Sequence, residues 1–380
     1  MVKKISNILF VIAFLAVLAL PLVLTDFSSG GISENENRTL ADFPAFTEEG
    51  KWNENFTGEF ETWFMDHLGL RQELIRANAT LQFRVFDRML EKSNYHIGRD
   101  GDLNYADTDM LLDYAHANLR TPEAVAQIGQ SFQTVSDWHT SQGIDFYYVQ
   151  CYDKHSIYPE QFMDTVRQIG DISKTDQVIT YLQEQTTVNT ISLKEPLLEA
   201  KAEYEVYSNW GDPTHWSPRG AFVGYQYMMQ QLNAGADTPY RVLQEEDYHI
   251  VVKNGGITLD DVVGQEDMLE YFSLREPQAE RADKAVMGPW AKDERHSVWK
   301  NPQAGNDIKL LLMCDSYFNS FIITDIAQSF SEVWLVWGDY TMDLPELVEQ
   351  YQPDIVIYEC AERVDRSHLV SKLADQIASQ

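Results

Sequence analysis

The C-terminal third of the chain alternates between unbroken apolar runs and amphipathic segments. The apolar runs over 308–314, 333–337 and 354–360 predict buried strands, and the segments 318–330 and 345–352 repeat their apolar positions at helical spacing. Strands that are apolar along their whole length and alternate with helices are typical of a parallel sheet with both faces covered. This pattern predicts an α/β fold.

The same alternation extends toward the N-terminus. We expect Thr121 to cap a helix that has Pro122 at its first position and Gly143 as its stop. The run over 144–152 then reads as a strand, and Ser217 opens a further helix. The parallel sheet is therefore expected to take strands from well before the C-terminal third.

The first residues have a different pattern. Lys3 and Lys4 precede an almost unbroken apolar run over 8–24, which is nearer the length of a spanning helix than that of a signal peptide. No small-residue cleavage motif follows the run. We expect an uncleaved signal-anchor, with basic residues before it and acidic residues after it placing the body of the protein outside the cytoplasm.

These patterns divide the chain into three parts. Residues 1–29 are the expected transmembrane anchor, and 30–105 are a polar and aromatic region with helical stretches that docks on the core. Residues 106–380 form the α/β domain. Within it, 254–303 is rich in acids, Gly and Pro with weak periodicity, so we expect an insertion that makes a lid or binding loops.

Charge, cysteine content and histidine spacing limit the partners and cofactors that we expect. Asp and Glu number 59 against 29 Lys and Arg, a formal charge of -30, which disfavours nucleic acid and anionic lipid surfaces and opposes a polyanionic substrate unless a local basic patch offsets it. Cys151, Cys314 and Cys360 lie in or at the end of apolar runs and are expected to be buried free thiols. The histidines lack ligand spacing, so we expect no metal and no cofactor.

Two short motifs contain candidate catalytic residues. Ser316 follows an apolar strand and opens a helix, a position where functional groups gather and backbone N–H groups can hold an oxyanion. Asp212 precedes His215 by three residues, so a bend can let its carboxylate hold the far imidazole nitrogen. A serine nucleophile needs a base, and the base needs an orienting group. Alone the motifs also fit a helix cap and a surface turn; together they predict a Ser-His-Asp triad.

These motifs resemble the SGNH-hydrolase superfamily. With Asp and His before Ser, the order resembles its permuted branch, which contains the DHHW proteins and the alginate O-acetylation proteins of the AlgX and AlgJ type. Further landmarks appear in that family's order: ENRTLADFP, FETWFMDHLGLR, IGRDGDLNY, YDKHSIYPE, DPTHWSPRGAFVGY, MCDSYFNSF and PDIVIYECAER. The resemblance covers residues 34–363, nearly all of the chain beyond the apolar segment.

The resemblance implies that Ser316 is an acyl-accepting nucleophile, His215 its general base and acid, and Asp212 the orienter. It implies O-acetyl transfer to hydroxyls of a cell-surface or secreted polysaccharide through an acetyl-serine, beside a membrane-bound exporter of acetyl groups of the O-acyltransferase type. Two features depart from the family pattern: Cys314 replaces the glycine before Asp-Ser, and several permuted members have D-x-H instead of D-x-x-H. A carbohydrate acetylesterase with the same triad and a non-catalytic polysaccharide-binding scaffold are the alternatives.

Four other residues are candidates near this site. Asn319, one helical turn after Ser316, is either an oxyanion donor or a helix cap. The resemblance puts Lys154 near the site. Tyr317 follows the nucleophile and is a candidate for substrate contact, as is Trp216, which we expect to pack against His215.

Some polar and aromatic residues have a structural interpretation as well as a functional one. Glu359 and Arg363, four residues apart, are expected to form an ion pair. Asp66, His67 and Arg71 are expected to make structural contacts that dock the N-terminal region. The tryptophans at 290 and 299 either stack on sugar rings or pack in the core.

Overall fold

The computed structural model describes residues 2–27, 32–33, 38–48, 50–86, 94–99, 101–236, 238–256, 266–338, 343–364 and 367–379. The chain forms two compact units. The first comprises Met1–Leu90 with Leu259–Val263, and the second comprises Glu91–Thr258 with Gly264–Gln380.

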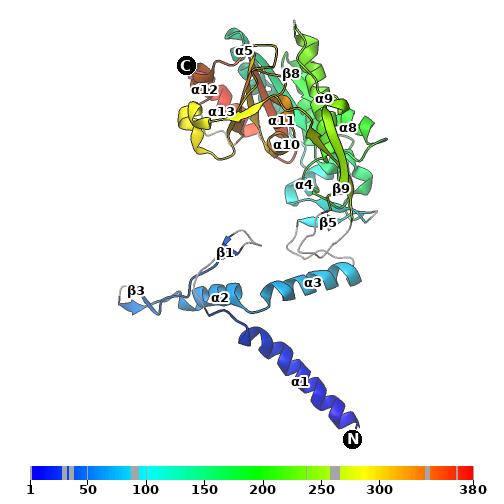
Figure 1. Ribbon diagram of the computed structural model, residues 1–380, viewed down its shortest axis with the longest axis vertical. Coiled ribbons are helices and arrows are strands. Elements are labelled where there is room, and N and C mark those ends of the chain that lie inside the picture. The colour runs from blue at the N-terminus through cyan, green and yellow to red at the C-terminus, as the bar shows by residue number, and fades with distance from the viewer. Residues whose placement is uncertain are drawn as a thin grey trace. The chain divides into compact units, whose positions relative to one another are not determined.

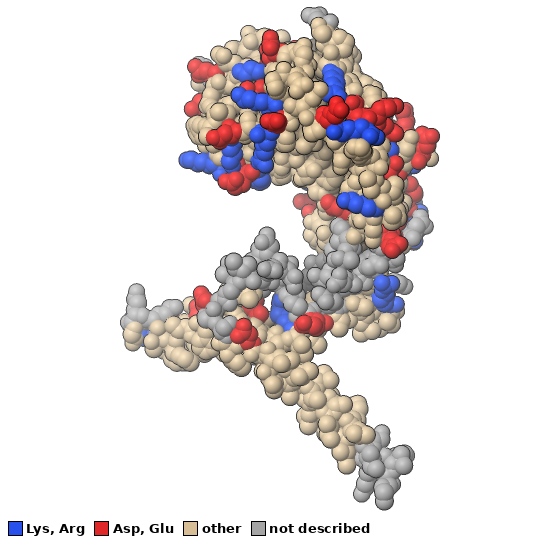
Figure 2. Space-filling view, in the orientation of Figure 1, with Lys and Arg blue, Asp and Glu red and all other residues tan. Residues whose placement is uncertain are grey.

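The first unit contains three helices and two short strand pairs. The helices are α1 (Val2–Val23), α2 (Phe56–His67) and α3 (Arg71–Phe86); the strands are β1 (Ile32–Ser33), β2 (Arg38–Thr39), β3 (Thr47–Glu48) and β4 (Lys51–Trp52). In Figure 2 the part of α1 that is not grey is tan, so it contains no Lys, Arg, Asp or Glu. Across the described part of the chain, however, no helix reaches the length and apolar character of a membrane span, so the expected anchor is not confirmed.

Asp66 and His67 make contacts inside the first unit. Asp66 Oδ2 accepts a hydrogen bond from Ala41 N at 2.9 Å, and His67 Nδ1 lies 2.9 Å from Trp63 O. The family landmark ENRTLADFP spans residues 36–44, and its first two residues, 36 and 37, lie outside the described residues. Asp66 and His67 are thus structural within this unit, and docking on the larger unit stays a prediction.

The second unit is built on a seven-stranded sheet with the order β11-β12-β14-β13-β15-β7-β8 (Figure 1). The five strands from β14 to β8 are parallel, and β11 and β12 are antiparallel additions at one edge. The strands are β7 (Asp145–Cys151), β8 (Asn189–Ser192), β11 (Glu280–Ala282), β12 (Ser297–Lys300), β13 (Lys309–Cys314), β14 (Glu332–Trp337) and β15 (Ile355–Ala361). The predicted α/β fold with a mostly parallel sheet is confirmed.

Helices cover both faces of this sheet. Along β13, Leu310, Leu312 and Cys314 join the core on one face, whereas Leu311 and Met313 join the core on the other. The first face is covered by α8 (Lys194–Ala200), α9 (Pro218–Gly235), α10 (Ser316–Phe321) and α11 (Ile323–Ile326). The second is covered by α5 (Pro122–Ser141), α7 (Lys174–Gln185), α12 (Leu344–Tyr351) and α13 (Ser367–Ala378).

The predicted helix boundaries hold where capping residues mark them. Thr121 caps α5 by accepting from Ala124 N, and Ser217 caps α9 by accepting from Gly220 N. Gly143 after α5 has φ +75°, the left-handed conformation that glycine adopts at low cost. The predicted single helix over 318–330 is wrong, because the chain breaks at Ile322 into the two short helices α10 and α11.

The insertion is more regular than expected. It contains β10 (Met268–Leu274), which pairs with β9 (Tyr248–Asn254) at its start, the 3₁₀ segment η4 (Lys284–Lys292), and the strands β11 and β12 that extend the main sheet. Strands of three or four residues are too short to leave a periodic signature, which is why the sequence indicated only loops. Its residues 257–265 lie outside the described residues.

The remaining elements of the second unit are short. They are β5 (Tyr95–Ile97), β6 (Leu103–Tyr105), α4 (Thr108–Tyr114), α6 (Lys154–Ile157), η1 (Pro159–Gln161) and η2 (Glu245–Asp247). The three cysteines are free and buried, as predicted.

Candidate active site

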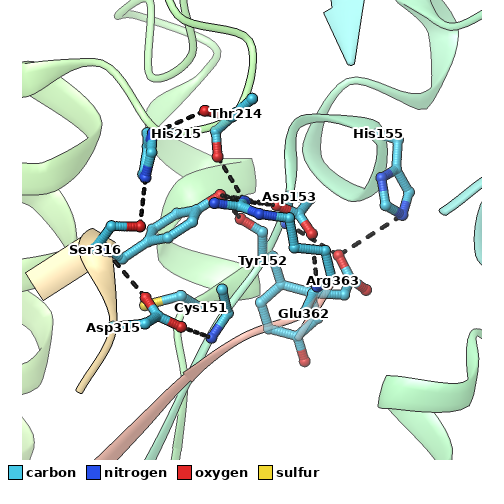
Figure 3. A network of polar contacts seen from close by, with 12 residues as sticks. Cys151, Tyr152, Asp153, His155, Thr214, His215, Asp315, Ser316, Glu362 and Arg363 are labelled. Atoms are coloured by element: carbon cyan, nitrogen blue, oxygen red, sulfur yellow. Dashed lines mark hydrogen bonds and ion pairs between the residues drawn. The ribbon is translucent and has the colours of Figure 1, made fainter. Parts of the chain in front are cut away.

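Ser316 and His215 face one another at the carboxyl end of the parallel strands (Figure 3), and Asp212 lies beside His215. Ser316 is the first residue of α10, directly after β13, whereas His215 and Asp212 lie in the loop before α9. His215 Nε2 is 2.7 Å from Ser316 Oγ, and His215 Nδ1 is 2.7 Å from Asp212 Oδ2. The imidazole therefore lies between hydroxyl and carboxylate, in the arrangement that a base-activated serine requires.

Thr214 holds the Asp212 carboxylate in place. Its backbone N–H and its hydroxyl donate to Asp212 Oδ1 at 2.8 Å and 2.5 Å. Burial raises the pKa of Asp212, but the hydrogen bonds from His215 and Thr214 outweigh it and hold the pKa below its ordinary value. The carboxylate is therefore ionised whenever the imidazole beside it could take up a proton.

Asp315 fixes the position of the serine. Its carboxylate caps α10 by accepting from Tyr317 N at 3.0 Å, and its other oxygen accepts from Ala361 N on β15 at 2.9 Å. Its own N–H donates to Glu359 Oε2 at 2.9 Å. Asp315 thus ties the end of β13 and the start of α10 to the neighbouring strand.

The His215 ring is held by aromatic rings of α10. Its centroid lies 5.1 Å from that of Tyr317 and 5.3 Å from that of Phe321. Trp216 stacks instead on Phe318 and meets the edge of Tyr317, and only 1% of it is exposed. The expected packing of Trp216 on His215 is wrong: the indole lies behind the site and supports the ring through Tyr317.

Like Trp216, Tyr317 is buried and is not available for the substrate contact considered from the sequence. It is fully buried, and its hydroxyl donates to Asp153 Oδ1 at 3.0 Å and to Tyr152 O at 3.1 Å. Its N–H is bound by Asp315, so it does not serve as an oxyanion donor. Buried Tyr317 therefore connects the triad to the end of β7.

Lys154 lies beneath the loop that carries the D-x-x-H motif. It is 3% exposed, and its ammonium donates to Leu103 O at 2.8 Å and to Ser208 O at 2.9 Å. Burial lowers its pKa to about 8. Its hydrogen bond to Ser208 O fixes the start of the loop that carries the D-x-x-H motif, and the side chain is not exposed for contact with a substrate.

The motif loop also requires a glycine. A Cβ atom on Gly211 would come within 2.3 Å of Ser208 Oγ and 2.7 Å of Gly255 O. Asp267 accepts hydrogen bonds from Trp210 N at 2.8 Å and from Gly211 N at 3.0 Å. The loop before Asp212 is thus pinned by the edge of the insertion.

Arg363 and Asp153 complete the support of the site, and sequence reasoning missed both roles. Arg363 forms an ion pair with buried Asp153, and its Nη1 donates to Thr214 O at 2.5 Å. The predicted ion pair between Glu359 and Arg363 is wrong, because β15 continues to Ala361 and Glu359 accepts from Asp315 N. Asp153 and Arg363 lie within two of the family landmarks, but no spacing in the sequence indicates that residues 210 positions apart form a pair.

Asn319 and Cys314 lie on either side of the serine along the chain. Asn319 is half-buried one turn after Ser316, and the capping role considered for it belongs to Asp315. Cys314 is fully buried in the core on the α9 side of the sheet. Its larger side chain therefore packs into the core instead of lying beside the Ser316 hydroxyl.

A groove of roughly 320 Å³ lies next to Phe321, and none of the three triad residues lines it. Phe321, which contacts the His215 ring, lies in its wall together with Phe272 and the half-buried Trp299. Trp290, in contrast, is buried in the core on the opposite face of the sheet. Of the two tryptophans considered from the sequence, Trp299 is thus the one that reaches a groove.

Residues 98–285, about half of the chain, match the family model described as an SGNH hydrolase-like domain, acetyltransferase AlgX. The matched segment contains Asp212 and His215 and ends before Ser316. A comparison with curated proteins gave no match.

Solved structures with a similar fold include Bacillus cereus PatB1 with a sulfonyl adduct, at a TM-score of 0.53 and 16% identity over 70% of this chain and 93% of that chain. They also include Bacillus cereus PatB1, at 0.51 and 17% over 64% and 91%. A DHHW family protein from Eubacterium siraeum has a TM-score of 0.47 and 14% identity over 77% and 97%. The resemblance in the sequence motifs is confirmed: residues 98–285 of the chain form an SGNH hydrolase-like domain of the AlgX family.

Proposed function

We propose that the chain is a serine O-acetyltransferase that moves an acetyl group onto a hydroxyl of a polysaccharide through an acetyl-serine. The observation that carries the proposal is His215, held at 2.7 Å both from Ser316 Oγ and from Asp212 Oδ2. The match to the AlgX acetyltransferase domain supports the acetyl group as the one transferred.

In the first step, Ser316 Oγ attacks the carbonyl carbon of an acetyl ester donor. His215 Nε2 takes the serine proton and passes it to the donor oxygen, which leaves as an alcohol when its bond to the carbonyl carbon breaks. Asp212 stabilises the imidazolium that forms in between and fixes the tautomer with the proton on Nδ1. The products are the acetyl-serine and the deacetylated donor.

In the second step, a polysaccharide hydroxyl attacks the acetyl-serine. His215 takes the hydroxyl proton and returns it to Ser316 Oγ, so the enzyme is regenerated and a new ester forms. In both steps the negative charge on the carbonyl oxygen needs donors. Because Asp315 occupies the N–H of Tyr317, we propose the N–H of Ser316 and the side chain of Asn319 for this role.

The groove along Phe321, Phe272 and Trp299 is the proposed acceptor site, since aromatic faces suit sugar rings. The basic residues before the apolar N-terminal run favour a membrane-attached protein that works outside the cytoplasm. The acetyl donor is then proposed to come from a membrane-bound exporter of the O-acyltransferase type, with no organic cofactor and no nucleic acid involved.

Acetate release from p-nitrophenyl acetate tests the triad. We expect Ser316→Ala and His215→Ala to lower kcat by at least about 10³-fold, and Asp212→Asn by about 10²–10⁴-fold, after subtraction of the spontaneous hydrolysis of this activated ester, because the three residues act as one unit. Ser320→Ala is the matched control, since Ser320 is exposed on the same helix. Activity that survives in Ser316→Ala would remove the proposed nucleophile.

Acceptor choice separates transfer from hydrolysis. Neutral oligosaccharides are added with the acetyl donor, and acetylated sugar is measured by mass spectrometry. We expect acetylated sugar that disappears in Ser316→Ala. Release of free acetate alone, at a rate that no oligosaccharide changes, would assign the triad to an esterase with water as acceptor; no turnover at all would favour a binding scaffold.

A further inference from the structure

A second polar cluster lies in the larger unit, formed by Asp113, His155 and Glu362. Asp113 comes from α4, His155 from α6, and Glu362 directly follows β15. Their exposed fractions are 2%, 4% and 3%. Figure 3 shows His155 and Glu362 facing one another beside Asp153, away from Ser316.

The spacing of these groups is too long for hydrogen bonds. His155 Nε2 lies 3.6 Å from Asp113 Oδ2 and 3.8 Å from Glu362 Oε2. Good hydrogen bonds of this kind measure about 2.7–3.2 Å. Two ligand atoms of one tetrahedral cation, with bonds of about 2.0–2.2 Å, are about 3.3–3.6 Å apart. The observed distances are closer to those between ligands that share an ion.

Several atoms of the cluster have no hydrogen-bond partner within the described part of the chain. These are Asp113 Oδ1, Glu362 Oε1 and both ring nitrogens of His155. The other oxygen of Glu362 accepts from Asp153 N at 3.0 Å. Buried polar atoms are nearly always bonded, so the unpaired His155 Nε2, which lies near an oxygen of each carboxylate, points to a further group that binds it.

The charges of the cluster, when both carboxylates are ionised, also suit a cation. Arg363, the neighbouring basic residue, is already paired with Asp153. Two buried carboxylates then face one imidazole, and even a protonated imidazole leaves one negative charge uncompensated. A divalent cation bound to a neutral imidazole balances both carboxylates.

We propose that Asp113, His155 and Glu362 bind a divalent transition-metal ion, with Zn²⁺ as the best-fitting candidate. One imidazole and two carboxylates suit Zn²⁺, with water as a fourth ligand, whereas Ca²⁺ and Mg²⁺ favour all-oxygen sites. These ligands could not be recognised from the sequence, because the three residues are widely separated and show none of the short ligand spacings.

The role of this ion is structural. It joins α4 and α6 to the segment after β15, where the next residue, Arg363, donates to Thr214 O beside the triad. The ion makes no contact with Ser316 or His215 in this arrangement and takes no part in acetyl transfer. Binding is therefore separable from activity: Ser316→Ala is expected to bind the ion unchanged.

The test is titration of the full chain, stripped with a chelator, with Zn²⁺ by calorimetry and with Co²⁺ by visible absorption. We expect one equivalent to bind and the unfolding temperature to rise with the ion. His155→Ala is expected to weaken binding by at least about tenfold, and the near-isosteric Glu362→Gln and Asp113→Asn to do the same. His249→Ala, at an exposed histidine, is the matched control that retains full binding.

Two results would overturn the proposal. One is the absence of saturable one-equivalent binding by the folded wild-type chain, which would leave a protonated His155 as the bridge between the carboxylates. The other is equal binding by wild type and by Glu362→Gln, the variant that keeps the side-chain shape if His155→Ala fails to fold. Either result leaves the test of Ser316 untouched, because that test measures acetate release.

Discussion

The side chain of Lys154 is buried in the larger unit. Burial lowers its pKa to about 8, against 10.5 for a free lysine. Between these two pH values the unfolded chain holds a proton at this position that the folded chain has lost. The free energy of unfolding therefore rises with pH over this window as far as this group is concerned, because folding no longer has to bury a charge.

Replacing Lys154 by methionine should remove that pH dependence and lower stability. The two carbonyls of Leu103 and Ser208 lose their donor, which we expect to cost about 1–3 kcal/mol at neutral pH. The measurement is urea unfolding from pH 7 to pH 10.5, with Lys300→Met as control because about half of the Lys300 side chain is exposed. A slope that is the same in Lys154→Met as in wild type would show that another group titrates.

At this same scale the sequence predicts some side chains of the site and misses others. Ser316, His215 and Asp212 come together as expected because each motif is short and its chemistry is local. Thr214 and Arg363 could not be predicted, since a threonine in a turn and an arginine after a strand have no distinctive spacing. Their roles follow from the way the loop before α9 lies over the end of β15.

The junction between β13 and α10 is the element on which the proposed nucleophile depends. The carboxylate of Asp315 satisfies the N–H of Tyr317 in the first turn and the N–H of Ala361 on the next strand. A cap alone contributes about 1 kcal/mol, and an unpaired buried N–H costs about 1–3 kcal/mol more. Because α10 has only six residues, it has few other contacts to fix its start.

Asp315→Ala is therefore expected to lower both stability and activity. Ser316 should lose its fixed distance to His215, and acetate release should fall by more than tenfold. Asp343→Ala is the matched control: Asp343 caps α12 by accepting from Glu346 N at 3.0 Å, far along the chain from the triad. Asp343→Ala should lose the stability that the cap of α12 contributes and keep its activity. Equal activity in the two variants would mean that the cap of α10 does not position the serine.

Elements are predictable from the sequence in proportion to their length and burial. β13, β14 and β15 are buried on both faces, so their apolar runs were unambiguous. The break at Ile322 was not foreseen, because the apolar positions continue through it without proline or glycine. β11 and β12 were not foreseen either, since strands of three and four residues take their stability from their partner strands and not from their own pattern.

For the whole molecule, the dominant physical property is its charge. With 59 acidic and 29 basic residues, the chain carries a formal charge of -30, and Figure 2 shows Asp and Glu spread over the surface with Lys and Arg among them. Near the triad, Arg363 is paired with Asp153, so its charge is largely neutralised. A polysaccharide that bears carboxylates would approach against a field of its own sign.

Salt should therefore change the reaction with anionic acceptors and leave that with neutral ones. Raising ionic strength from about 10 mM to about 150 mM shortens the screening length from about 30 Å to about 8 Å. We expect kcat/KM for an oligosaccharide that carries uronic acids to rise over this range, while that for a neutral oligosaccharide of equal length stays constant. Initial rates of acetylated product by mass spectrometry, with Ser316→Ala as background, give both values. A fall with salt for the anionic acceptor would instead reveal a local basic surface that recognises it, because screening lowers kcat/KM only where it weakens an attraction.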